Sequence, residues 1–136
     1  MGIEQTAHDF FDACETGKGW DGCKAFCTEG AAFSAQADAL AEITTLEAYT
    51  DWMKGLLVPV ADGHYELKAF ATDAERGIVL AFAVFKGTHS VDGPVPATGK
   101  TIAADYVYAM KFDGDKIAHV TKIWNDGHSL KQLGWA

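Results

Sequence analysis

The apolar residues of the first segment recur at the spacing of a helix. One stripe is formed by Ile3, Ala7, Phe10, Phe11 and Cys14. Gly17 and Gly19 follow this stripe, and glycine commonly ends helices. The pattern predicts an amphipathic helix that packs this stripe against a core.

A second, shorter helix is predicted after Gly19, carrying Trp20, Cys23, Phe26 and Cys27, and residues 31–35 read as a brief strand. Cys23 and Cys27 are one helical turn apart, a spacing that a metal site or a redox pair could use. Buried thiols that act as small hydrophobes are the simpler interpretation. The chain has three cysteines, an odd number that cannot fully pair, so reduced thiols are expected.

The third helix has the clearest signals. Thr44 and Glu47 have the spacing of a capping box, and Pro59 lies where the helical pattern stops. Between them the apolar residues recur at helical spacing: Leu46, Tyr49, Trp52, Met53, Leu56 and Leu57. A core helix and a helix that lines a pocket both explain this pattern.

From His64 onward the hydrophobic period changes to two, which is typical of strands. Strands are predicted over residues 64–72, 78–89, 98–112 and 116–124, with turns at 73–77 and 113–115 and a loop at 91–99. A short helix is predicted over 126–133, with Asn125 or Asp126 as its N-cap and Gly134 after its end. His64 and His89, at strand ends, are predicted to lie on the surface, and Gly87 to serve a turn.

Helices followed by a meander of long strands predict a single α+β domain over residues 1–136, with helices covering one face of a curved, mainly antiparallel sheet. Residues 78–85 are apolar on both faces of their strand. The outer face of the sheet therefore needs a cover, and a symmetric partner is the simplest one. We expect a homodimer formed through this face.

The charge narrows the list of partners. The net charge is −8 at neutral pH, so the field of the protein repels nucleic acid and anionic membrane surfaces. No window has the run of about 18 apolar residues that a membrane span needs, and the first residues lack the basic and apolar regions of a signal peptide. The expected location is the cytoplasm, without nucleic-acid or membrane partners.

Residues 107–117, in which a phenylalanine precedes an Asp-Gly turn and a Lys-Ile pair, are followed by Trp124-Asn125 and by the closing Gln132-Leu133-Gly134. In these features the C-terminal half of the chain resembles SnoaL-like polyketide cyclases. Residues 25–33 resemble the passage from the second helix into the first strand in the wider nuclear transport factor 2-like superfamily. The resemblance implies the cone-shaped, cystatin-like fold of that superfamily, a strongly curved sheet with helices on its concave side, a pocket between them, and usually a dimer.

The catalytic carboxylates of two enzyme groups of this superfamily are not found at the matching positions. Ketosteroid isomerase-like members use a tyrosine and an aspartic acid as hydrogen-bond donors to the oxyanion, and a second aspartate as the base. The tyrosine matches Phe10 or Phe11, the base matches Ala35, and the aspartic acid donor matches Tyr108, which can still donate a hydrogen bond. In SnoaL-type cyclases the aspartate of the last strand matches Lys122. Burial would lower the pKa of such a lysine and make it a base or a Schiff-base nucleophile. Alternatively, its stem packs while its ammonium reaches a carboxylate or a ligand anion.

If Lys122 points into the pocket, strand alternation places Val120, Tyr106 and Tyr108 on the same face. Lys122 and Tyr108 are the predicted catalytic residues. The predicted substrate-binding residues are apolar or aromatic: Phe11, Phe33, Tyr49, Trp52, Met53, Tyr106 and Trp124. A register shift of one residue would instead bring Asp105 and His119 inward.

The sequence has no phosphate-binding glycine loop, serine-centred elbow, dinucleotide fingerprint or metal-binding histidine pair, so neither a cofactor nor a metal is implied. Three hypotheses for the function remain. The protein is a lyase or isomerase that acts on a hydrophobic carbonyl compound, or a non-catalytic protein that binds a small hydrophobic molecule in the same pocket. A module that binds a protein through its outer sheet face is a third hypothesis.

Overall fold

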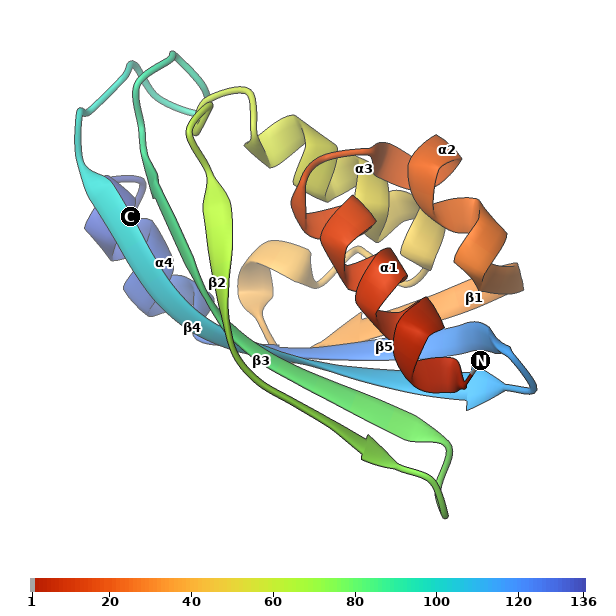
Figure 1. Cartoon of the computed structure of the whole chain (residues 1–136). Helices are drawn as coiled ribbons and strands as arrows, with labels where there is room; N and C mark the ends of the chain where they lie inside the picture. The colour runs from red at the N-terminus through yellow and green to blue at the C-terminus, as the bar shows by residue number, and fades with distance from the viewer. Residues whose placement is uncertain (1) are drawn as a thin grey trace.

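The computed structural model describes residues 2–136 (Figure 1). Its helices are α1 (Ile3–Glu15), α2 (Gly19–Cys23), α3 (Leu46–Leu56) and α4 (Asp126–Leu133), with short 3-10 helices at Lys24–Phe26 and Asp38–Leu40. Its strands are β1 (Cys27–Ala35), β2 (His64–Asp73), β3 (Ile78–Thr88), β4 (Thr101–Asp113) and β5 (Lys116–Trp124). The predicted order of elements is confirmed. None of the helices in the described part is long and apolar enough to cross a membrane.

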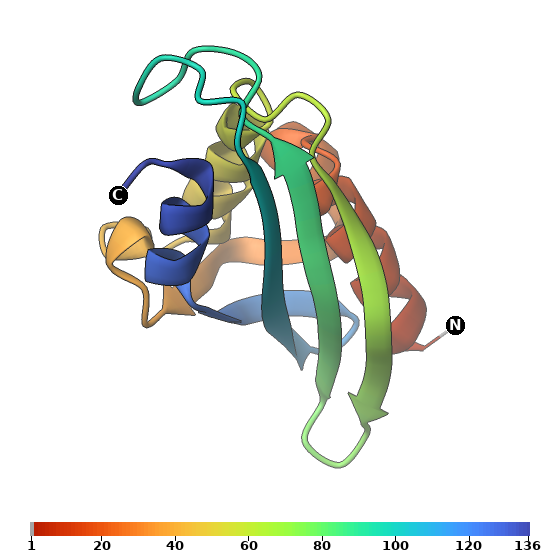
Figure 2. The same cartoon turned by 90° about the vertical axis from the view of Figure 1, so that its left-hand side faces the viewer.

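The five strands form one open sheet in the order β1-β5-β4-β3-β2. All neighbours are antiparallel except β1 and β5, which run parallel. The sheet curves strongly, and α1, α2 and α3 lie on its concave side (Figure 1). Viewed from the side, α4 lies beside the first part of β4 (Figure 2), where Gln132 Oε1 accepts a hydrogen bond from the Ala103 N–H at 3.1 Å.

Three local expectations at element boundaries were wrong. The N-cap of α3 is Thr45, whose hydroxyl accepts from Ala48 N at 3.1 Å. Thr44 lies one residue before this cap, where its carbonyl accepts from Phe33 N of β1 at 2.9 Å. The first strand begins at Cys27 rather than at residue 31, so Cys23 and Cys27 do not share a helix. All three cysteines are buried and unpaired.

His89 is fully buried, contrary to the surface position predicted for it. Its Nδ1 accepts hydrogen bonds from Trp135 Nε1 at 2.9 Å and from Thr98 N at 3.2 Å. A strand-end residue becomes buried here because the loop after β3 and the end of the chain fold over it. Gly87 does not serve a turn either; it lies in β3, where a Cβ would come within 2.4 Å of Val60.

The register of the last two strands follows the prediction. Tyr108 pairs with Lys122 and Tyr106 with Trp124. All four point to the side of the helices, where Tyr108 bonds to Glu15 of α1 and the other three line the same cavity. The alternative candidates Asp105 and His119 lie on the outer face, where His119 bonds to Ser34 Oγ at 2.8 Å. The inward register therefore holds.

The outer face of the sheet is partly apolar. Phe82 of β3, Val107 of β4 and Ile123 of β5 lie side by side across the sheet. Ile123 is 63% exposed, and Leu80 and Phe82 are 44% and 37% exposed. Among the residues that the structure describes, this row remains partly to largely exposed.

Candidate active site

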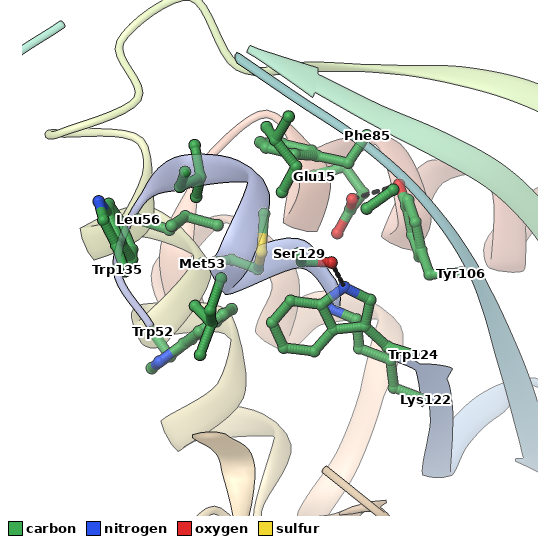
Figure 3. Close-up of a pocket in the computed structure, with 14 residues that line it drawn as sticks. Glu15, Trp52, Met53, Leu56, Phe85, Tyr106, Lys122, Trp124, Ser129 and Trp135 are labelled. Carbon is green, nitrogen blue, oxygen red and sulfur yellow. Dashed lines mark hydrogen bonds between the residues drawn. The ribbon is translucent and has the colours of Figure 1, made fainter. Parts of the chain in front are cut away.

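A cavity lies between the concave face of the sheet, α3, the end of α1 and α4 (Figure 3). Its empty space is about 500 Å³, including the part that opens to solvent. The lining is mostly apolar, with three tryptophans: Glu15, Trp52, Met53, Leu56, Phe85, Ile102, Ala104, Tyr106, Lys122, Trp124, Ser129, Leu130, Leu133 and Trp135. Small-molecule sites typically have this mixture of apolar walls with a few polar groups.

Glu15 is the last residue of α1, and only 1% of it is exposed. The hydroxyl groups of Tyr106 and Tyr108 donate to its two carboxylate oxygens. Burial raises the pKa of Glu15, while the positive charge of Lys122 and the two tyrosine hydroxyls oppose that rise. The cavity therefore contains a carboxylate that holds a proton more readily than an exposed one does.

Lys122 points inward from β5 and is 6% exposed. Its Nζ donates to the Tyr49 hydroxyl at 2.9 Å. The ammonium also lies 4.4 Å from the centre of the Trp124 ring, with the rings of Tyr49, Tyr106 and Trp52 between 5.1 and 5.5 Å away. Burial lowers the pKa of Lys122 to about 8, and the charge of Glu15 limits the decrease.

A continuous set of hydrogen bonds connects Lys122 to Glu15. Tyr49 and Tyr108 have their hydroxyl oxygens 2.7 Å apart. Tyr108 uses its only hydroxyl hydrogen on Glu15, so Tyr49 must donate to Tyr108. Burial raises the pKa of both phenols, so both stay protonated at neutral pH. The donors thus run in one direction, from Lys122 through Tyr49 and Tyr108 to Glu15.

The wall on the side of α4 is tied to the sheet by Trp124. Its indole Nε1 donates to Ser129 Oγ at 2.7 Å (Figure 3), and Ser129 Oγ donates to the Asn125 carbonyl at 3.0 Å. Asn125 is also the N-cap of α4, accepting from His128 N at 3.0 Å, as one of the two predicted caps. These bonds fix the Trp124 ring against the Lys122 ammonium.

The cavity brings together some of the residues selected from the sequence. Lys122, Trp52, Met53, Tyr106 and Trp124 line it. The other selected residues, which pack behind the wall without lining it, are Tyr108, Tyr49, Phe11 and Phe33. Phe33 stacks on Tyr49 with ring centres 4.1 Å apart.

Glu15 was not selected from the sequence, although a signal was present. It lies four residues after Phe11, on the same side of the predicted helix, and so it continues the apolar stripe. A charged residue within an apolar stripe indicates a buried, functional carboxylate. The contribution of α4 was also missed, because the packing of a short terminal helix depends on contacts distant in sequence.

Comparison with known proteins identifies the family. Residues 7–120 match the model of the SnoaL-like domain, so the chain belongs to the SnoaL-like family. No curated protein matches the sequence significantly.

Solved structures share the fold across nearly the whole chain. Wild-type IdmH of Streptomyces antibioticus, described as a candidate polyketide cyclase, is similar with a TM-score of 0.80 and 17% identity over 98% of this chain and 99% of that one. AclR of Streptomyces galilaeus, described as a candidate hydroxylase, has a TM-score of 0.77 and 16% identity over 98% and 85% of the two chains. A candidate polyketide cyclase of Bacillus cereus has a TM-score of 0.76 and 19% identity over 98% and 80%. These likenesses show the nuclear transport factor 2-like fold, and the different activities assigned to them show that the fold alone does not define the reaction.

Proposed function

We propose that the protein binds a small hydrophobic carbonyl compound in the cavity and moves a proton on the carbon next to the carbonyl group, as a lyase or isomerase of the polyketide-cyclase type. The observation that carries this proposal is that Glu15 and Lys122 line one apolar cavity. A base and a cation facing the same small volume are the two groups that enolisation needs.

In this proposal Glu15 removes the proton from carbon and Lys122 stabilises the oxygen that becomes negative. The raised pKa of Glu15 makes it a stronger base than an exposed carboxylate. The Lys122 ammonium, with a pKa of about 8, remains charged at neutral pH and can give up its proton to an alkoxide or enolate. The Tyr106 side chain, which also lines the cavity, orients the Glu15 carboxylate.

Family membership supports the class of reaction. Two of the three solved structures described above are named as candidate polyketide cyclases. Closure of a polyketide ring forms a carbon–carbon bond after a proton is removed beside a carbonyl. The pair of Glu15 and Lys122 supplies the acid–base chemistry of such a step without an aspartate at the position of Lys122.

A second candidate function is binding without catalysis. It is favoured by one observation, that Glu15 already accepts from two tyrosines, which stabilise its charged form. In that function Lys122 and the tryptophans hold a ligand and no bond changes.

The binding of β-naphthol tests the site. This phenol has the shape of the enol of the bicyclic ketone β-tetralone, and its hydroxyl can bond to Glu15 or Lys122. We expect saturable binding by calorimetry, weakened about tenfold or more by Lys122→Met, because the ligand loses a charge-assisted hydrogen bond. Lys131→Met, at an exposed position of α4, is the matched control and should bind like the wild type. Equal affinity of all three proteins would remove Lys122 from the binding site.

We also propose a homodimer formed through the outer sheet face and a cytoplasmic location. The row of Phe82, Val107 and Ile123 supports the dimer, because a second copy would remove these side chains from water. The three unpaired cysteines in the described part fit a reducing compartment.

A further inference from the structure

Glu15 and Lys122, which face the cavity, are also connected by hydrogen bonds on the side away from the cavity. Lys122 Nζ lies 2.9 Å from the Tyr49 oxygen, the Tyr49 and Tyr108 oxygens are 2.7 Å apart, and Tyr108 bonds to Glu15. Every oxygen and nitrogen along this path is within hydrogen-bond distance of the next. Glu15 and Lys122 line the cavity, whereas Tyr49 and Tyr108 do not.

The path is shielded and its rings are fixed. Tyr49 and Tyr108 both have no exposed surface. Tyr49 is held between the rings of Phe33 and Trp52, both stacked on it, at 4.1 and 5.9 Å. Neither solvent nor a ligand in the cavity reaches the two phenols between Glu15 and Lys122, so only protons can pass along them. Cys14 Sγ lies 3.6 Å from the Tyr108 hydroxyl, but burial raises the pKa of this thiol well above its usual value, so it keeps its proton.

We infer that Tyr49 and Tyr108 form a proton relay that returns the site to its starting state after each reaction, an inference that rests on the proposed function. When Glu15 takes a proton from carbon and Lys122 gives one to the carbonyl oxygen, the C–H electron pair becomes the double bond of the enol. A neutral carboxyl group and a neutral amine remain. The two hydroxyl groups first turn so that Tyr108 donates to Tyr49 and Tyr49 donates to the neutral amine of Lys122. The Glu15 proton then passes to Tyr108, the Tyr108 proton to Tyr49, and the Tyr49 proton to Lys122.

Each tyrosine gains one proton and loses one, so the net change is the transfer of one proton from an O–H bond of Glu15 to an N–H bond of Lys122. The product of the relay is the arrangement that the structure shows, with donors running from Lys122 to Glu15. Tyr49 and Tyr108 touch no reacting atom and are positioning residues. Tyr106 bonds to Glu15 but lies outside the path to Lys122.

Tyr49→Phe interrupts the relay and leaves the bonds of Glu15 in place. The reaction to follow is deuterium exchange at the carbon next to the carbonyl of β-tetralone, measured by NMR in heavy water. We expect Tyr49→Phe to slow steady-state exchange about tenfold or more, with β-naphthol affinity changed less than about twofold, and added imidazole to restore the rate. Tyr65→Phe is the matched control, because the Tyr65 hydroxyl bonds to Asp12 outside the path. Exchange by Tyr49→Phe at the wild-type rate, or a loss that imidazole does not restore, would overturn the relay.

If the wild-type protein does not exchange deuterium into β-tetralone, this result counts against the proposed function and not against the relay. A second measurement then tests the relay. The pKa of Lys122 is measured by NMR in the wild type, Glu15→Gln, Tyr49→Phe and the double variant. A relay couples the two ends, so the effect of Glu15→Gln should shrink by at least about half when Tyr49 is absent. Additive effects would show that the two charges interact only through space and would overturn the relay.

Discussion

Glu15 and Lys122 are both buried on the wall of one cavity, yet the Lys122 ammonium donates to Tyr49 rather than to the Glu15 carboxylate. A direct buried ion pair would leave both groups engaged with each other and neither free to act on a ligand. Separation by two phenols keeps the charges balanced through hydrogen bonds. The carboxylate and the ammonium therefore remain directed at the cavity.

The protonation of Lys122 gives a first prediction. Its NMR titration, followed at the Cε carbon and assigned by its loss in Lys122→Met, should have a midpoint near pH 8. Glu15→Gln should move this midpoint lower, because the carboxylate charge favours the ammonium. A midpoint near the ordinary lysine value of about 10.4 would contradict the buried position.

The same group makes stability depend on pH. The pKa of Lys122 is about 8 in the folded protein, below its value of about 10.5 in the unfolded chain, so the unfolded chain binds more protons between these two pH values. The contribution of Lys122 to stability therefore increases as pH rises from about 8 to 10.5. Over this interval the urea midpoint of the wild type should rise relative to that of Lys122→Met. A difference between the two midpoints that does not change with pH would contradict this prediction.

Ser129→Ala should destabilise the protein by about 1 to 3 kcal/mol, because it leaves the indole N–H of Trp124 without its partner at a largely buried site. Equilibrium unfolding in urea, followed by tryptophan fluorescence, measures the change. Ser90→Ala, at an exposed position, is the control and should stay within about 0.5 kcal/mol of wild type. Equal losses of stability in both variants would show that the hydrogen bond to Trp124 does not contribute to stability.

Two glycines offer opposite outcomes for the same substitution. Gly87→Ala places a methyl group 2.4 Å from Val60 and 3.1 Å from the Gly63 backbone, and should cost about 1 to 3 kcal/mol. Gly55→Ala, inside α3 with open space around it, should instead stabilise by about 0.5 to 1 kcal/mol. A denaturation midpoint of Gly87→Ala at or above that of the wild type would contradict the packing described for β3, and a lowered midpoint of Gly55→Ala would contradict the open space described at α3.

The proposed dimer predicts a change in mass in solution. Phe82→Lys should convert a dimer to a monomer in analytical ultracentrifugation, because it places a charge in the apolar row. Val91→Lys, at a 45% exposed loop position away from that row, should remain dimeric. A monomeric wild-type protein would show that the outer face has another role.

The predictable part of this structure is the part encoded in local periodicity. The turn at Gly114, the helix end at Gly134 and the inward register of Tyr108 and Lys122 follow from residue spacing and strand alternation. Spacing places Glu15 on the apolar stripe of α1 but does not reveal its partners, and the burial of His89 does not follow from spacing, since the end of the chain covers it at Trp135. The Glu15 carboxylate is accommodated by two tyrosines more than ninety residues away, a contact that only the closed fold creates.

Deuterium exchange into β-tetralone, compared between wild type, Glu15→Gln and the exposed control Glu42→Gln, tests the central claim most directly. The account predicts exchange by wild type and Glu42→Gln, and a loss of about a hundredfold or more in Glu15→Gln, because the base that takes the proton is absent. Exchange that persists in Glu15→Gln at the wild-type rate would contradict the assignment of Glu15 as the base of this site.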